Sequence, residues 1–173
     1  MWIWLCVIAA VVLVDQATKL LTVAMLAEGE SVAVIPDVFH LTYVQNEGAA
    51  FGMLSDHRWV FMIISSVAII ALCIYLWKFR PDSLWACTAL SLIIGGGIGN
   101  MIDRVRLSYV IDMIDFCAFP HLWMWIFNVA DACVCVGAGI LLVWLIVSMI
   151  QETKKEKAKK AETVEEKNGE ENV

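Results

Sequence analysis

The chain has 173 residues, 61% of them hydrophobic and 17% charged, whereas soluble domains have about 25% charged residues. From residue 151 onward lie 13 of the 30 Lys, Arg, Asp and Glu residues, so the first 150 residues hold only 17. This body is too apolar for a water-soluble globule or a disordered chain, and with a net charge of −6 and no basic patch the chain is not expected to bind nucleic acid.

Four long apolar segments predict four transmembrane helices, since about 20 apolar residues cross a bilayer. They cover approximately residues 1–26, 59–77, 84–102 and 123–150. We expect the first to be a retained helix rather than a cleaved signal peptide, because it lacks a basic start and continues past any plausible cleavage site. Residues 1–150 are therefore predicted to form a mainly α membrane domain, followed by a charged, disordered tail at residues 151–173.

Lys and Arg residues predict the orientation of these helices. Lys78 and Arg80 lie in the short loop between the second and third segments, and five lysines open the tail. Four spans place this loop and both termini on the same side, so we expect both termini to be cytoplasmic. Three arginines at the other side weaken this trend without reversing it.

The opposite, outer side is expected to hold two connections. Within residues 28–57, the sequence VAVIPDVFHLTYV includes an alternation of Val38, His40, Thr42 and Val44 with Phe39, Leu41 and Tyr43, which predicts a short strand or hairpin. The turn-rich sequence NEGAAFG follows it. Residues 105–122 are predicted to be a loop of moderate polarity.

The cysteines and histidines give no indication of a metal site. Most of the six cysteines lie in apolar runs, and only Cys133 and Cys135 are close, on a helix that would point their thiols to different faces. His40, His57 and His121 are scattered in the expected outer loops. We therefore predict neither a metal nor a cofactor.

The polar residues of the spans are expected to collect at one depth, near the outer ends of the helices. At a rise of about 1.5 Å per residue, Asp15 lies in the outer half of the first helix. Placing an ionisable group in a membrane costs on the order of 3 kcal/mol, so such a group is a functional hypothesis. The other members of this set end the third helix or begin the fourth: Asn100, Asp103, Arg104, Asn128 and Asp131.

Each of these residues also has a purely structural interpretation. Asp15 and Lys19 have the i, i+4 spacing of a helical ion pair, which taken alone favours a structural role over a catalytic one. Asp103 and Arg104 could mark a helix end at the lipid headgroups. The sequence GGGIG at 95–99 could serve close helix packing, and the helix dipole favours Asp131 in a first turn.

Taken together, the polar residues favour a catalytic interpretation. Asp112 and Asp131 come from different segments and could face each other where the third and fourth helices open outward. Two close carboxylates share one proton, so one can act as a base on water and the other as an acid toward an amide. This chemistry of aspartic proteases needs no metal, and Asn100, Asn128 and Arg104 could hold the pair or orient a peptide.

Five sequence blocks in this order resemble the bacterial lipoprotein signal peptidase (signal peptidase II) family over about residues 5–145. They are DQATK (15–19), NEGAAFG (46–52), GGGIGNMIDR (95–104), YVIDMIDF (109–116) and FNVADACVCVG (127–137). The resemblance implies an aspartic endopeptidase of the bacterial cytoplasmic membrane with its active site toward the extracytoplasmic side. It also implies a substrate, a diacylglyceryl-modified prolipoprotein, cut just before its lipidated cysteine.

The resemblance implies roles for individual residues. Asp112 and Asp131 would be the catalytic pair. Asp112 is followed by Met113 where the family usually has Phe, and the nearby Asp115 precedes a Phe, but Asp112 has the expected spacing from Arg104. The supporting or substrate-binding residues would be Asp15, Lys19, Asn46, Gly48, Asn100, Asp103, Arg104, Asn128 and Ala130.

The same resemblance implies the surroundings of this site. We expect a small extracytoplasmic β-sheet and a loop that cover the substrate, contact with membrane lipid, inhibition by globomycin-like cyclic peptides, and a monomer.

Two other classes of protein share some of these features. A small ion- or proton-coupled transporter would also hold intramembrane Asp residues and Gly-rich helices, but it needs polar groups along a path to both sides. Here the inner halves of the spans are almost free of charge. A structural membrane subunit would leave the clustered Asp, Asn and Arg residues without a role, and the absence of a GxGD sequence argues against presenilin-type proteolysis.

Overall fold

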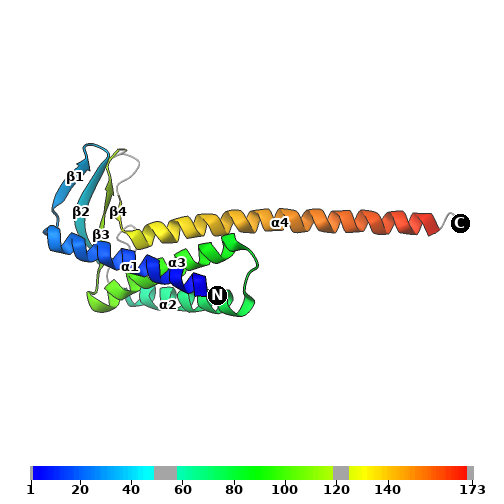
Figure 1. The fold of residues 1–173 in the computed structure, drawn as a ribbon, viewed down its shortest axis with the longest axis horizontal. Helices are drawn as coiled ribbons and strands as arrows, with labels where there is room; N and C mark the ends of the chain where they lie inside the picture. Colours follow the sequence, from blue (N-terminus) through cyan, green and yellow to red (C-terminus); the bar gives the residue numbers. More distant parts are fainter. Residues whose placement is uncertain (1, 49–57, 119–124, 171–173) are drawn as a thin grey trace.

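The computed structural model describes residues 2–48, 58–118 and 125–170. Within these ranges the helices run lengthwise beside one another, and a sheet stands at one end of them (Figure 1). The helices are α1 (Trp2–Met25), α2 (Arg58–Ile74) with a π-helical turn η3 (Tyr75–Phe79), α3 (Leu84–Arg106) and α4 (Val129–Glu170). The strands are β1 (Ser31–Ile35), β2 (Phe39–Asn46), β3 (Val110–Phe116) and β4 (Ile126–Phe127).

Four helices of the described ranges are long and apolar enough to cross a membrane, which confirms the predicted fold class. The candidate spans are Trp2–Met25, Met62–Phe79, Leu84–Arg106 and Val129–Lys157. The fourth begins at Val129 rather than near residue 123, because β4 occupies the residues just before it. Residues 119–124 lie outside the described ranges, as do the loop at 49–57 and therefore the predictions made for His57 and His121.

Helix α3 packs against the three other helices, and its small residues make this possible. A side-chain carbon added at Gly96 would collide with the Ala130 carbonyl of α4, and one at Gly99 would lie 2.5 Å from the Asp15 carboxylate of α1. Glycine therefore lets α4 and a charged residue of α1 approach the α3 backbone directly. This confirms the interpretation of GGGIG as a close-packing sequence.

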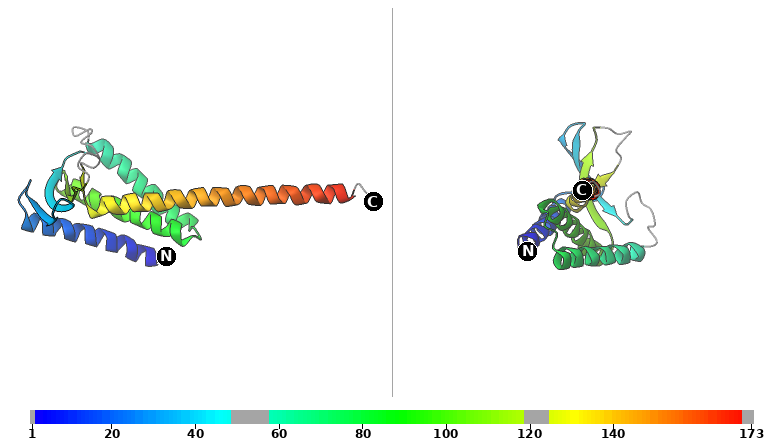
Figure 2. Two further views of the ribbon diagram at one scale, coloured as in Figure 1. Left: turned by 90° about the horizontal axis from the view of Figure 1, so that it is seen from above. Right: turned by 90° about the vertical axis from the view of Figure 1, so that its right-hand side faces the viewer.

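The four strands form one antiparallel sheet in the order β1-β2-β3-β4. Seen along the long axis of the molecule, the sheet stands to one side of the helices (Figure 2). β1 and β2 form the predicted hairpin, in which Ser31 pairs with Thr42. The prediction of a loop at residues 105–122 is wrong, because residues 110–116 form the inner strand β3. At the start of β3, the residues on both faces of the strand are buried. Its sequence VIDMIDF therefore lacks the alternation of apolar and polar residues that identifies a half-exposed strand.

Helix α4 continues far beyond the other helices to Glu170 (Figure 1), so the structure has a helix where we expect a disordered tail. The tail is rich in Lys and Glu, which are good helix formers. Its charge pattern predicts exposure, and residues 151–157 are exposed.

Candidate active site

A cluster of buried polar side chains lies where α1, α3, β3 and the start of α4 meet. These side chains would be costly to bury without partners, yet within the described ranges every buried side-chain nitrogen and oxygen has a hydrogen-bond partner. The network is therefore satisfied without any added group. Its buried members are Asp15, Lys19, Asn100, Asp103, Asp112 and Asn128.

Lys19 is the cation at the base of this cluster. Its Nζ lies 2.9 Å from Asp15 Oδ2 and 2.9 Å from Asp103 Oδ2, and the side chains of Lys19 and Asp15 are 1% and 0% exposed. Its third bond goes to Asn100 Oδ1, 2.9 Å away. The predicted Asp15–Lys19 ion pair is thus present, and it extends to α3. The second oxygen of Asp15 accepts a bond from the Ala130 amide at 2.9 Å, which ties α4 to the same point.

Asp112 on β3 accepts hydrogen bonds at both of its carboxylate oxygens. Asn46 Nδ2 of β2 donates to Oδ2 at 2.8 Å, and Asn128 Nδ2 donates to Oδ1 at 2.6 Å. The Gly48 amide donates to Asn46 Oδ1 at 3.1 Å, so the Asn46 amide is held with its NH₂ group toward Asp112. Two predicted supporting residues, Asn46 and Gly48, therefore fix the orientation of this carboxylate.

Asp131 occupies the first turn of α4, where it and Asn128 cap the helix reciprocally. The Asp131 amide donates to Asn128 Oδ1 at 2.9 Å, and the Asn128 amide donates to Asp131 Oδ2 at 3.3 Å. This is the arrangement of a capping box, which satisfies two backbone donors of a helix start. Asn100 Nδ2 of α3 donates to the other oxygen, Oδ1, at 2.7 Å.

Two asparagines link the two aspartates. Asn128 Nδ2 reaches Asp112 and also Asn100 Oδ1, 3.1 Å away, while Asn100 Nδ2 reaches Asp131. Lys19 occupies the same Asn100 oxygen, so the NH₂ group of Asn100 has to face Asp131. The buried ion-pair network therefore determines which polar atom is presented to each carboxylate.

The environment of Asp112 raises its pKa to about 6 from the model-peptide value of 3.8. The largest cause is burial, which disfavours the charged carboxylate, and the negative charge of Asp131 acts in the same direction. The hydrogen bonds from Asn46 and Asn128 oppose this by stabilising the ionised form. A proton is therefore available on this pair of carboxylates close to neutral pH.

Both aspartates line one cavity of about 330 Å³. Arg104, whose Nη1 donates to the Asn100 carbonyl at 3.4 Å, brings a positive charge to this cavity. Trp125 and Phe127 give it an aromatic wall at the strand next to β3. The cavity thus places an apolar surface beside two carboxylates, which are linked to each other by a polar network.

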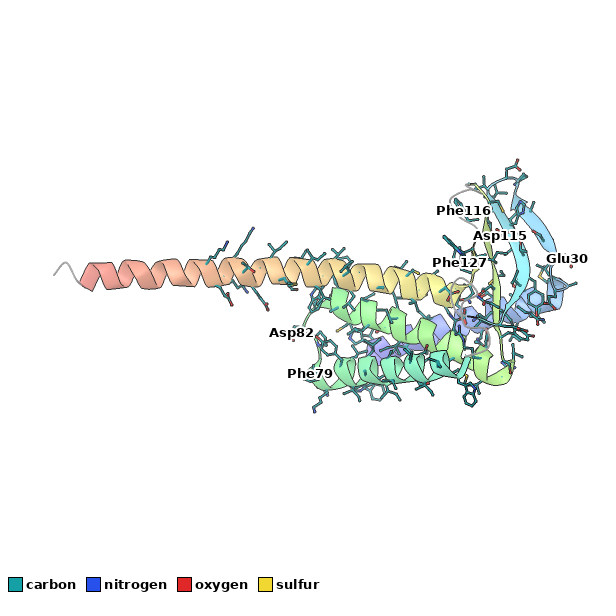
Figure 3. The ribbon with its side chains drawn as sticks, turned by 180° about the vertical axis from the view of Figure 1, so that it is seen from behind. Glu30, Phe79, Asp82, Asp115, Phe116 and Phe127 are labelled. Atoms are coloured by element: carbon teal, nitrogen blue, oxygen red, sulfur yellow. The ribbon has the colours of Figure 1, made fainter. Side chains whose placement is uncertain are left out.

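Asp115, the other acidic residue of β3, has a different position. Its Oδ2 accepts a bond from Thr42 Oγ1 at 2.8 Å, and it is not among the described residues that line the cavity. Asp112 and Asp115 are three residues apart, so they point to opposite faces of the strand. Figure 3 shows Asp115 on the sheet next to Phe116.

Gln16 belongs to this network although we do not predict it as a site residue. Its Nε2 donates to Asp103 Oδ1 at 2.9 Å and to the Gly99 carbonyl at 3.2 Å. Asp103 in turn accepts the Ile111 amide at 3.2 Å, which anchors the start of β3. The available signal was an amide side chain within an apolar segment, directly after Asp15.

Comparisons with known proteins agree on one family. A family model described as signal peptidase (SPase) II matches residues 7–147. The lipoprotein signal peptidase of Halothermothrix orenii is 45% identical over 80% of this chain and 92% of its own length. That of Caldanaerobacter subterraneus subsp. tengcongensis is 49% identical over 78% of this chain and 90% of its own.

Two solved structures of bacterial membrane enzymes have a similar fold. One has a TM-score of 0.80 and 33% sequence identity, covering 86% of this chain and 90% of its own. The other has a TM-score of 0.76 and 34% identity, covering 84% of this chain and 93% of its own.

Proposed function

This chain belongs to the signal peptidase II family, whose members remove signal peptides from prolipoproteins, and we propose that Asp112 and Asp131 are its catalytic pair. The observation that carries the proposal is that both carboxylates line the same cavity and are joined through Asn100 and Asn128. The pKa of Asp112 is raised to about 6, which favours the shared proton that such a pair needs.

The proposed reaction begins with one proton on the pair, held by Asp112. The ionised Asp131 takes a proton from a water molecule, and the water oxygen adds to the scissile carbonyl carbon, whose oxygen receives the proton of Asp112. The C–N bond of this tetrahedral intermediate then breaks. Asp131 gives its proton to the leaving nitrogen, and a hydroxyl of the intermediate returns a proton to Asp112, which restores the starting state.

Three of the supporting residues act on this pair through hydrogen bonds. Asn46 and Asn128 hold the Asp112 carboxylate, and Asn100 holds that of Asp131. Since these amides are themselves fixed by Gly48 and Lys19, the carboxylates need little rearrangement during the reaction. Arg104 adds a positive charge to the cavity wall, where it can bind a peptide carbonyl.

The proposed substrate is a prolipoprotein that carries diacylglycerol on a cysteine, cut at the bond just before that cysteine. The polar cluster lies at the end of the apolar helices that is next to the sheet. A peptide bond bound there can therefore belong to a residue whose acyl chains remain in the membrane. The aromatic wall formed by Trp125 and Phe127 gives the cavity an apolar surface beside the carboxylates. A lipidated cysteine combines these two requirements.

The proposed orientation places the sheet and the cavity on the extracytoplasmic side of the bacterial cytoplasmic membrane. Phe79 and Asp82 lie at the end of the helices away from the sheet (Figure 3), and the neighbouring Lys78 and Arg80 belong to that end. The N-terminus and the long extension of α4 point the same way (Figure 1). Basic residues favour the cytoplasm, so both termini are assigned to that side.

The expected monomer is supported by the fact that one chain supplies both carboxylates and the three asparagines that hold them. We expect globomycin-like cyclic peptides to occupy this cavity and block it.

A direct comparison of two substrates tests this function. The purified protein in detergent should release the signal peptide from a diacylglyceryl-modified prolipoprotein and leave the same polypeptide uncut when it lacks the lipid. Equal cleavage of both forms would contradict the proposed specificity, and cleavage of neither by a folded protein would contradict the proposed activity. A globomycin-like peptide should stop the reaction.

A further inference from the structure

A second cluster of ligand-type side chains lies on the sheet, apart from the aspartate pair. It consists of His40 on β2, Asp115 on β3 and Cys117 directly after β3. One ligand atom from each, an imidazole nitrogen, a carboxylate oxygen and the thiol sulfur, lies within 4.8 Å of the other two. All three side chains are half-buried, so they are partly shielded but open to an ion from solution.

The strand register brings these three residues together. His40 and Asp115 are direct partners in the β2–β3 ladder. The Cys117 amide donates to the Val38 carbonyl at 2.9 Å, which continues the pairing beyond the end of β3. Asp115 and Cys117 are two residues apart and therefore point to the same face of the sheet. The backbone thus holds all three side chains on one face before any ion binds.

This cluster is separate from the proposed catalytic pair. The β2–β3 pairing has a bulge between Leu41 and Val44. The extra residue of this bulge belongs to β2, so β3 itself is regular. Asp112 and Asp115 consequently project from opposite faces of β3. A ligand bound at His40, Asp115 and Cys117 would not occupy the cavity that Asp112 and Asp131 line.

The charges around the cluster favour a cation. Asp115 forms no ion pair within the described ranges, where the ion pairs are those of Lys19. Its contact is with the neutral Thr42 hydroxyl, 2.8 Å away. The negative charge of Asp37, in the turn between β1 and β2, also acts on the Cys117 thiol. Among the residues that the structure describes, no lysine or arginine therefore neutralises the Asp115 carboxylate beside this thiol.

We propose that His40, Asp115 and Cys117 bind a divalent zinc-type cation, with water in the fourth position. Sulfur, imidazole nitrogen and a single carboxylate are ligands of Zn²⁺, whereas Ca²⁺ and Mg²⁺ require mostly oxygen. Tetrahedral zinc places such ligand atoms about 3.5 Å apart, so these three atoms, which lie within 4.8 Å of one another, have to move closer together on binding. On binding, the thiol releases its proton to solvent and becomes the thiolate ligand.

Such an ion would hold the sheet together at the end of β3. It would join β2 to β3 through His40 and Asp115, and Asp115 also pairs with Ile126 of β4. Because β3 carries Asp112 three residues earlier, the ion would stabilise the strand that supports the proposed site without contacting it. This inference concerns a metal site apart from the proposed catalytic pair and does not depend on the proposed function.

Metal titration of the full chain in detergent tests this proposal. The protein, purified without a histidine tag and treated with a chelator, is titrated with Zn²⁺ alone and with Co²⁺ alone. We expect one ion per chain, a thiolate-to-cobalt charge-transfer band in the near ultraviolet, and a higher melting temperature with Zn²⁺. Cys117→Ser should remove the band, and His40→Gln and Asp115→Asn should each weaken binding by at least about tenfold.

Two matched variants identify the site. Cys6→Ser changes an exposed thiol on α1, and Asp112→Asn removes a carboxylate of the proposed pair, so both should bind the ion like the unchanged protein. Loss of binding in either variant, or undiminished binding in Cys117→Ser, would overturn the proposal. So would a failure of the unchanged protein, folded by its melting curve, to bind Zn²⁺ at micromolar concentration.

Discussion

The Lys19 ammonium donates a 2.9 Å hydrogen bond to the side-chain oxygen of Asn100, and this bond turns the NH₂ group of Asn100 toward Asp131. Lys19, which is not among the described residues that line the cavity, therefore determines which atom of Asn100 contacts the Asp131 carboxylate. Lys19 is itself held between Asp15 and Asp103. The buried ion-pair network supports the fold and orients the site through the same atoms.

Replacing Lys19 should therefore destabilise the protein strongly. Lys19→Met leaves the carboxylates of Asp15 and Asp103 buried without their cation, and breaking a buried ion pair in this way costs about 3–5 kcal/mol. Thermal or denaturant unfolding in detergent measures the change. Lys154→Met, at an exposed position on α4, should alter stability little. Equal stability of the two variants would contradict the role assigned to Lys19.

The close approach of α3 and α4 makes a second prediction. Gly96→Ala should lower the melting temperature and reduce activity, because the added methyl group collides with the Ala130 carbonyl next to Asp131. Gly139→Ala is the matched control, since a methyl group there has no heavy atom within 4 Å. Its expected effect is neutral or stabilising by up to about 1 kcal/mol, through helix propensity. A harmless Gly96→Ala would show that the helices are not in direct contact.

The hydrogen bond from Asn46 predicts a shift in the pH profile. This bond lowers the pKa of Asp112, which burial and Asp131 raise to about 6. Removing it by Asn46→Ala should raise that pKa further, so Asp112 keeps its proton to higher pH. The alkaline limb of kcat/KM should then move to higher pH, because this limb reports loss of the proton needed for catalysis.

A variant on the neighbouring strand provides the control for this measurement. Ser31→Ala removes a hydroxyl of β1 that contacts Thr42 and not Asp112, so its pH profile should match that of the unchanged protein. A limb that stays in place, or moves to lower pH, in Asn46→Ala would contradict the assignment of the limb to Asp112.

Much of the fold was predictable from the sequence because the strongest signals are local. Apolar segments of sufficient length identify the four spans, and the alternation in residues 38–44, after Pro36, indicates the strand or hairpin that β1 and β2 form. β3 was missed because burial on both faces removes the alternation from its sequence. The continuation of α4 beyond residue 150 was not predicted, since the Lys- and Glu-rich tail has the composition of both a helix and a disordered segment.

Several residues of the candidate site could be predicted from the sequence, but the hydrogen bonds between them could not. Asn100, Asn128 and Asp131 could be grouped because polar residues are rare in the spans, and Asp112 because its segment joins the third and fourth helices. The partner of each amide depends on how α1, α3 and α4 pack, which no local pattern reveals. The contribution of Gln16 and the cluster around His40 were missed for this reason, as both depend on residues that are distant in the sequence.

The positions of the ion pairs argue against the transporter interpretation. The ion pairs of the described residues all involve Lys19, in the part of α1 near the sheet, and Asp131 lies within the first turn of α4. A transporter would require titratable groups that continue toward the opposite end of the helices. The clustering at one depth fits an enzyme whose substrate reaches the site from one side.

The most direct test of the proposed catalytic pair is the rate at which the purified protein releases the signal peptide from a diacylglyceryl-modified prolipoprotein. Asp112→Asn and Asp131→Asn should each reduce this rate by about 10²–10⁴-fold, since neither amide can exchange the proton. Asp82→Asn, the same change at the opposite end of the helices, should retain the full rate. Full activity in either Asp112→Asn or Asp131→Asn, with the protein folded, would contradict the account.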